Sequence, residues 1–124
     1  MVTDSYEALN RGDVDAAMEA LAEDAEWHES EALPETGVYR GRAAIRSFLT
    51  EFLASWESFH QEIEETTVAG DRVAALIHLT ATGRESSAEV DAHYAHVWQL
   101  RDGLGVRVDA YYDRAEALAA LGDG

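Results

Sequence analysis

Apolar residues in the first half of the chain recur at helical spacing in two stretches. The first comprises Val14, Ala17, Met18, Leu21 and Ala22, and the second Ile45, Phe48, Leu49, Phe52, Leu53 and Trp56. Positions three and four residues apart form one face of an amphipathic helix. Asp13 precedes the first stretch and is a typical N-cap residue. Together with the segment that starts at Ser5, the pattern predicts three helices before residue 57.

A short strand is predicted between these helices. Ala25, Trp27 and Glu29 alternate with polar residues in the segment that ends at Ser30. Alternate residues of a strand share one face, so Glu29 is predicted on the same face as Trp27. If Trp27 faces the core, a carboxylate faces it as well.

The second half alternates in a way that predicts four strands, separated by turns with glycine. The strands are Phe59 to Val68, Asp71 to Gly83, Glu89 to Arg101 and Gly105 to Tyr112. Asp113 is predicted to cap a short terminal helix that Gly122 ends. The long loop from Ser30 to Arg40, which contains Pro34, is expected to form a flap over a pocket.

Length and composition predict one domain over residues 1–124, because 124 residues with 47% apolar content can bury one sizeable core but not two. No apolar run approaches a membrane span, and the N-terminal residues lack a signal pattern, so a cytoplasmic protein without membrane contact is expected. The chain has no cysteine, which excludes disulfides, thiolate nucleophiles and zinc-thiolate sites.

The net charge of the chain indicates which partners it can bind. There are 25 acidic residues against 9 basic ones, and the formal net charge is −16. All the basic residues are arginine. Nucleic acid is therefore excluded as an expected partner, since its affinity depends on cationic contacts to phosphate. The acid excess without lysine is typical of proteins adapted to high salt; an ordinary acidic protein from a high-GC bacterium is the alternative.

Five short segments in this order resemble the NTF2-like superfamily, in its ketosteroid isomerase and SnoaL-like polyketide cyclase branch. They are Asn10 to Asp13, Ala22 to Trp27, Gly41 to Ile45, Arg101 to Gly103 and Ala110 to Leu118. The resemblance covers nearly the whole chain. It implies an α+β cone, with three N-terminal helices packed on a curved antiparallel sheet and a short C-terminal helix.

The resemblance also implies a catalytic pair. Glu29 corresponds to the general base of ketosteroid isomerase, and His96 corresponds to a donor that stabilises the enolate oxygen. The oxyanion tyrosine of that enzyme corresponds to Ser5, whereas Tyr6 is expected to point about 100 degrees around the helix. A faithful steroid isomerase is therefore not expected. Asp109 is kept as a further candidate acid, because SnoaL-like cyclases use an acid near the last strand.

An aromatic and apolar pocket is expected around this pair. Its candidate wall residues share the face of Glu29 and His96 or lie on the helix above, with His78 added as a polar candidate: Trp27, Phe48, Phe52, His78, Tyr94, Trp98, Val108 and Tyr112. No metal and no cofactor is expected. His93 and His96 point to opposite faces of one strand and so cannot form a metal pair.

These residues predict binding of a small apolar carbonyl compound, with acid-base isomerisation or cyclisation as the chemistry. The alternative is a non-catalytic binding or dimerisation scaffold, in which the aromatic residues are ordinary core. In that case His96 is a satisfied core histidine and Glu29 reaches solvent at a strand end. A homodimer is expected, because the sheet face away from the helices is predicted to be apolar.

Overall fold

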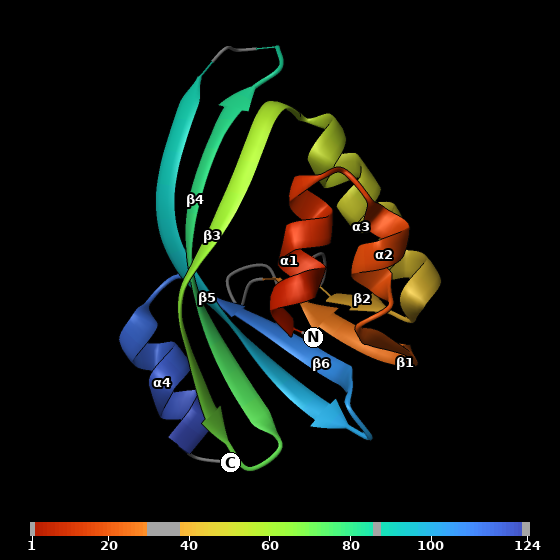
Figure 1. The fold of residues 1–124 in the computed structure, drawn as a ribbon, viewed down its shortest axis with the longest axis vertical. Coiled ribbons are helices and arrows are strands. Elements are labelled where there is room, and N and C mark those ends of the chain that lie inside the picture. The colour runs from red at the N-terminus through yellow and green to blue at the C-terminus, as the bar shows by residue number, and fades with distance from the viewer. Residues whose placement is uncertain (1, 30–37, 86–87, 123–124) are drawn as a thin grey trace.

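The computed structural model describes residues 2–29, 38–85 and 88–122. Helices and strands follow one another in the order shown in Figure 1: α1 (Val2–Asn10), α2 (Val14–Met18), β1 (Leu21–His28), β2 (Val38–Arg40), α3 (Arg42–Ala54), β3 (Trp56–Ala69), β4 (Arg72–Gly83), β5 (Glu89–Arg101), β6 (Leu104–Tyr111) and α4 (Arg114–Gly122). The predicted class, α+β, is confirmed, and three of the four helices in the described residues precede β3. Residues 30–37 of the expected flap lie outside the described residues.

The six strands form one curved sheet in the order β2-β1-β6-β5-β4-β3. Four of the five neighbouring pairs are antiparallel, but β1 and β6 run parallel. The expectation of a wholly antiparallel sheet is therefore wrong. The sheet is mixed because β1 pairs with β6, the last strand of the chain, and runs parallel to it. In this pairing Trp27 lies opposite Val108.

The first predicted boundary to differ lies between α2 and β1. The helical spacing was expected to continue through Leu21 and Ala22, but α2 ends at Met18 and both residues belong to β1. Both are buried in the strand, because Gly105 donates its N–H to the carbonyl of Ala20 and draws β6 alongside. Pairing with a distant strand overrides the local spacing here.

Other local signals are confirmed. Asp13 accepts a hydrogen bond from the N–H of Ala16, and Asp113 accepts one from the N–H of Ala115. Asp102 and Gly103 both have positive φ in the tight turn between β5 and β6, which is the turn that an Asp-Gly pair predicts. Trp56, expected in the helix, is the first residue of β3.

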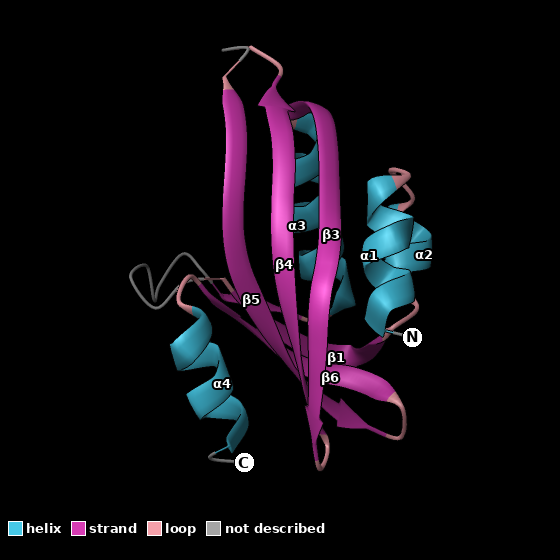
Figure 2. Cartoon of the chain, turned by 60° about the vertical axis from the view of Figure 1, so that its left-hand side comes forward, coloured by secondary structure: helices cyan, strands magenta, loops and turns pink. Residues whose placement is uncertain are grey.

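The two faces of the sheet are covered by different helices (Figure 2). Helices α1, α2 and α3 cover the inner face and pack with Val73, Ala75 and Ile77 in the main core. Helix α4 lies on the outer face, where Ala117 and Leu121 pack on a smaller cluster that contains Leu76 and Val97. The apolar outer face on which the dimer prediction rested is thus covered by the chain's own last helix.

Candidate ligand pocket

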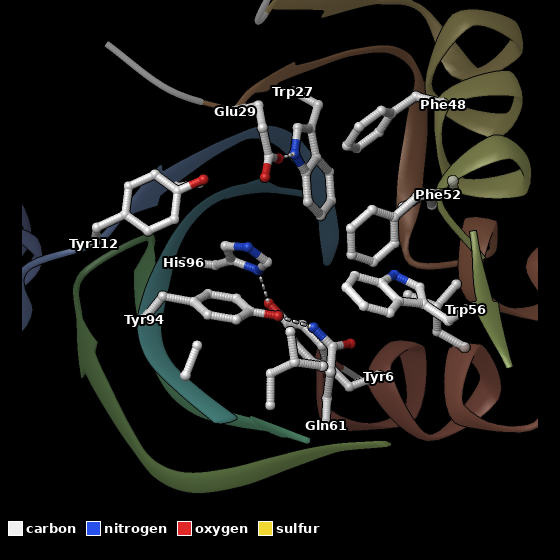
Figure 3. A pocket seen from close by; sticks show the side chains of 15 residues that line it. Tyr6, Trp27, Glu29, Phe48, Phe52, Trp56, Gln61, Tyr94, His96 and Tyr112 are labelled. Atoms are coloured by element: carbon white, nitrogen blue, oxygen red, sulfur yellow. Dashed lines mark hydrogen bonds between the residues drawn. The ribbon is translucent and has the colours of Figure 1, made fainter. Parts of the chain in front are cut away.

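A cavity of about 160 Å³ lies between α3 and the inner face of the sheet. Figure 3 shows its wall, which is mostly apolar and aromatic. The lining residues are Tyr6, Leu9, Trp27, Glu29, Phe48, Leu49, Phe52, Trp56, Gln61, Leu79, Ala92, Tyr94, His96, Ala110 and Tyr112. A mostly apolar cleft or cavity with a few polar groups is the usual form of a small-molecule site.

Glu29 lies just beyond the end of β1, where the alternation predicted it, on the same side as the buried Trp27. The indole Nε1–H of Trp27 donates to Oε2 of Glu29 over 2.6 Å. Burial raises the pKa of Glu29, and the Trp27 hydrogen bond partly opposes that rise because it stabilises the carboxylate. The result is a carboxyl group that holds its proton more firmly than a surface glutamate.

His96 projects from β5 into the inner core and is 4% exposed. Its Nδ1 lies 2.7 Å from the hydroxyl of Tyr6, and the indole N–H of Trp98 donates to that hydroxyl over 2.9 Å. Burial lowers the pKa of His96 to about 3, since charge is unfavourable in this apolar surrounding. The ring is therefore neutral near pH 7.

The hydrogen bonds around Tyr6 favour one assignment of the proton on the His96 ring, because the opposite assignment leaves the buried Tyr6 hydroxyl proton without this acceptor. Trp98 can only donate, so the Tyr6 oxygen accepts from it. The Tyr6 hydroxyl proton then finds its acceptor at Nδ1 of His96. Nδ1 as acceptor leaves the proton of the neutral ring on Nε2, which Figure 3 shows on the side that faces Trp27 and Glu29. The pocket thus holds one N–H donor and one carboxyl group on neighbouring parts of its wall.

Tyr6 was not among the predicted wall residues. Tyr6 was expected to point about 100 degrees around the helix from the position of the isomerase tyrosine, and it is 3% exposed and lines the cavity. Val2, Tyr6 and Leu9 form the buried face of α1, while the Ser5 hydroxyl bonds to the carbonyl of Ala17 in α2. The spacing of Val2, Tyr6 and Leu9 is the signal that would have placed the tyrosine inside.

Among the other wall residues that were not predicted, Gln61 and Trp56 carry polar groups, whereas Leu9, Leu49, Leu79, Ala92 and Ala110 are apolar. Gln61 is a polar residue at an inward position of β3 between Phe59 and Ile63, and it is 5% exposed. Its side chain bonds to the hydroxyl of Tyr94. Trp56 packs edge-on against Phe52. The alternation of β3 would have identified Gln61, since a polar side chain among inward apolar positions needs a reason.

Not every predicted site residue reaches the cavity. Seven do: Glu29, His96, Trp27, Phe48, Phe52, Tyr94 and Tyr112, the last of which is 68% exposed at its rim. Trp98 and Val108 are fully buried beside it in the core. Asp109 points to the outer face, where both its oxygens accept from the guanidinium of Arg107. Residues on β6 alternate, so Asp109 cannot share the face of Val108.

His78 also lies on the outer face and not in the pocket wall, with Nε2 2.8 Å from Oδ1 of Asp91. Its ring stacks on that of His93, with ring centroids 4.3 Å apart. Within the described residues, Glu64, His78 and His93 bring potential metal-ligand atoms within 4.8 Å of one another. This is the group that could hold a metal such as zinc, although Glu64 already pairs with Arg114. His93 and His96 point to opposite faces, as predicted.

The order of elements, the helix-covered curved sheet and the pocket beneath α3 define the NTF2-like class of protein. A sequence model of the SnoaL-like domain matches residues 2–108. The chain therefore belongs to the SnoaL-like domain family. A search of curated proteins found no match.

Solved structures with this fold include three with informative descriptions. A candidate polyketide cyclase from Xanthomonas campestris is 28% identical, with 97% of this chain and 93% of that one covered and a TM-score of 0.72. An NTF2-like protein of unknown function from Burkholderia pseudomallei is 23% identical, with 97% and 93% covered and a TM-score of 0.80. A protein from Catenulispora acidiphila with a ketosteroid isomerase-like fold, in complex with trimethylamine, is 21% identical, with 98% and 91% covered and a TM-score of 0.80.

No helix among the described residues is long and apolar enough to cross a membrane.

Proposed function

We propose that this protein binds a small carbonyl compound in the inner cavity and moves a proton next to its carbonyl group. Glu29 is the proposed base and Nε2–H of His96 the proposed donor to the carbonyl oxygen. The observation that carries the proposal is that both groups line one apolar cavity, each held by a neighbouring side chain. The candidate polyketide cyclase among the solved structures is consistent with this chemistry.

The proposed step breaks a C–H bond beside the carbonyl. The Glu29 carboxylate takes the proton, the C–H electron pair forms a carbon–carbon double bond, and the carbonyl π electrons move to oxygen. His96 then donates a hydrogen bond to this enolate oxygen. Return of the proton to the same carbon exchanges hydrogen. In a compound whose carbonyl is flanked by a carbon–carbon double bond, return of the proton to the far end of the conjugated dienolate shifts that double bond, and attack of the enolate carbon on a second carbonyl of the same compound forms a ring.

Burial suits both groups to these roles. The raised pKa of Glu29 makes it a stronger base than a surface glutamate, closer to the operating pH. The lowered pKa of His96 keeps the ring neutral, and a neutral imidazole can polarise a carbonyl. A preorganised donor of this kind contributes roughly 2.7 to 4 kcal/mol to lowering a barrier.

Cavity size limits the ligand. About 160 Å³ is close to the roughly 150 Å³ cavity that holds one benzene molecule. We therefore propose a compound of about one ring, not a four-ring steroid.

The same volume favours the alternative, a non-catalytic binding protein or scaffold. Small-molecule sites usually have cavities of roughly 300 Å³ or more, and the cavity that Glu29 and His96 line is smaller than that. In the alternative, Tyr6, His96 and Trp98 form a satisfied buried network whose purpose is to hold α1 against the sheet.

Hydrogen exchange separates the two proposals. Acetophenone and cyclohexanone are single-ring ketones whose protons next to the carbonyl can be followed by NMR in D₂O. With the wild-type protein present, these protons should exchange with deuterium faster than in buffer alone. The Glu29→Gln variant should give the same exchange rate as buffer. Glu26→Gln is the matched control, because Glu26 lies on the same strand but pairs with His28.

Exchange that is unaffected by Glu29→Gln would remove Glu29 as the base. Exchange no faster than in buffer for both ketones would favour the scaffold.

Two other proposals concern the whole molecule. Homodimerisation was expected from an exposed apolar outer face, but α4 covers that face. A single mass near 13.6 kDa by light scattering at all salt concentrations would exclude a homodimer. Adaptation to high salt rests on the net charge of −16.

A further inference from the structure

Gln61 is held rigidly at the floor of the cavity. Its backbone N–H donates to Oδ1 of Asn10 over 2.8 Å, and its carbonyl accepts from Nδ2 of the same residue over 2.9 Å. This reciprocal pair joins the end of α1 to β3. The side chain therefore begins from a fixed point and, at 5% exposure, has little freedom to turn towards solvent.

Only one end of the Gln61 amide has a partner. Nε2 bonds to the hydroxyl of Tyr94, whereas Oε1 is buried without a hydrogen bond within the described residues. The indole Nε1–H of Trp56, on the wall of the same cavity, is likewise buried without a partner. Figure 3 shows the amide beside Trp56, on the other side of the cavity from Trp27 and Glu29.

Buried polar groups in folded proteins almost always have partners, and each exception needs an explanation. Here the residues that carry an unpartnered acceptor and an unpartnered donor both belong to the cavity wall, at some distance from Glu29 and His96. A hydroxyl group satisfies both kinds, because it donates through its proton and accepts through its lone pairs. A methyl group of similar size satisfies neither.

We infer that the pocket selects a ligand with two polar ends: a carbonyl that meets His96 and Glu29, and a hydroxyl that meets Gln61 and Trp56. The ligand class is a hydroxylated cyclic ketone of about one ring. This inference rests on the proposed function for the carbonyl end. Gln61 is then a specificity-determining residue, because a site built to bond a hydroxyl discriminates against the analogue that lacks it.

Calorimetry with two probes of similar size tests the inference. The probes are 4-hydroxycyclohexanone and 4-methylcyclohexanone, each titrated into the wild-type protein, Gln61→Leu and Gln99→Leu. Gln99 lies on the outer face of the sheet, beside Arg107, and serves as the matched control. The wild type and Gln99→Leu should bind the hydroxyl compound at least about 10-fold more tightly. Gln61→Leu should lose this preference.

A second variant, Gln61→Met, guards against a folding defect, and circular dichroism of each variant shows whether it folds. Equal affinity of the wild type for the two probes would overturn the inference, as would a preference that persists in the folded Gln61 variants. Hydrogen exchange of the ketones distinguishes failure of this inference from failure of the proposed catalytic function. Exchange that depends on Glu29 without a hydroxyl preference removes only this inference, whereas a Gln61-dependent preference without exchange removes only the catalytic proposal.

Discussion

Neighbouring histidines on β5 show how the two faces of the sheet produce different chemistry from one residue type. His96 faces inward, is 4% exposed and has its pKa lowered to about 3 by burial. His93, three residues earlier, faces outward, is exposed and stacks on His78 beside Glu64. The inner histidine is a neutral hydrogen-bonding group of fixed orientation. The outer histidines belong to a solvated network of carboxylates and arginine.

The difference arises from what covers each face. On the inner face, α1 brings Tyr6 over His96 and excludes water, so the hydrogen bonds of His96 and Trp98 to Tyr6 have no replacement from solvent. On the outer face, α4 covers only the apolar cluster around Leu76, and His78 lies beyond it. Loss of one partner should therefore be costly inside and nearly neutral outside.

Among the substitutions that test this difference between the inner and outer faces, the largest expected effect is on ligand binding. His96→Ala should weaken binding of 4-nitrophenolate, which mimics an enolate, by about 2 kcal/mol or more, because a hydrogen bond to a charged oxygen is lost. Binding of 4-nitrotoluene, which has a similar shape, should change little. Fluorescence or absorbance titration measures both. Equal losses for the two compounds would mean that His96 only shapes the pocket.

A smaller loss is expected from Tyr6→Phe, measured as the free energy of unfolding in urea. The change leaves Nδ1 of His96 and Nε1 of Trp98 buried without their shared partner. An unsatisfied buried group costs about 1 to 3 kcal/mol. Tyr39→Phe is a control, since the Tyr39 ring stacks on Phe48 from a half-buried position. If the two variants are equally stable, the inner network does not stabilise the fold.

Salt should raise the thermal stability of the protein by screening repulsion among its acidic residues. Repulsion among 25 acidic residues opposes folding, and at 1 M salt the Debye length is about 3 Å, which screens it. The melting temperature should therefore rise with potassium chloride well beyond 0.1 M. A melting temperature that stays constant up to about 2 M would contradict adaptation to high salt.

The smallest expected effect is that of His78→Ala on the outer face. Its bond to Asp91 joins an exposed carboxylate to a half-buried ring, and such surface pairs contribute about 0 to 1 kcal/mol. The free energy of unfolding should fall by less than about 0.5 kcal/mol, and phenolate binding should not change. A loss as large as that of Tyr6→Phe would show that the two faces do not differ as described.

Much of the pocket could be predicted from local patterns. The alternation of β1 placed Glu29 with Trp27, whereas His96 was selected by the resemblance to ketosteroid isomerase. Tyr6 was missed because a one-residue offset on a helix turns a side chain by about 100 degrees, and the family position fell on Ser5. The alternation of β6 already separated Asp109 from the pocket face.

Long-range pairing could not be predicted in the same way. Leu21 and Ala22 fit a helix as well as a strand, and only contact with β6 decides between them. The same holds for α4, whose position on the outer face depends on Ala117 and Leu121 meeting strands far away in the sequence. Nor does local spacing show that Gln61 would keep one amide atom unpartnered.

The titration of Glu29 tests the proposed pocket chemistry most directly. Carboxyl ¹³C NMR of labelled glutamate, with Glu29→Gln to assign the signal, should give a pKa above 4.5, the value without perturbation, because burial disfavours the charged form. Since the folded state then binds the proton more tightly than the unfolded state, Glu29 should lower stability as pH rises from about 4.5 through its folded pKa. Glu29→Gln should remove that dependence. Bound 4-nitrophenolate should raise the pKa further, because its negative oxygen lies near the carboxyl group. An ordinary pKa that does not respond to the phenolate would contradict a buried base opposite His96.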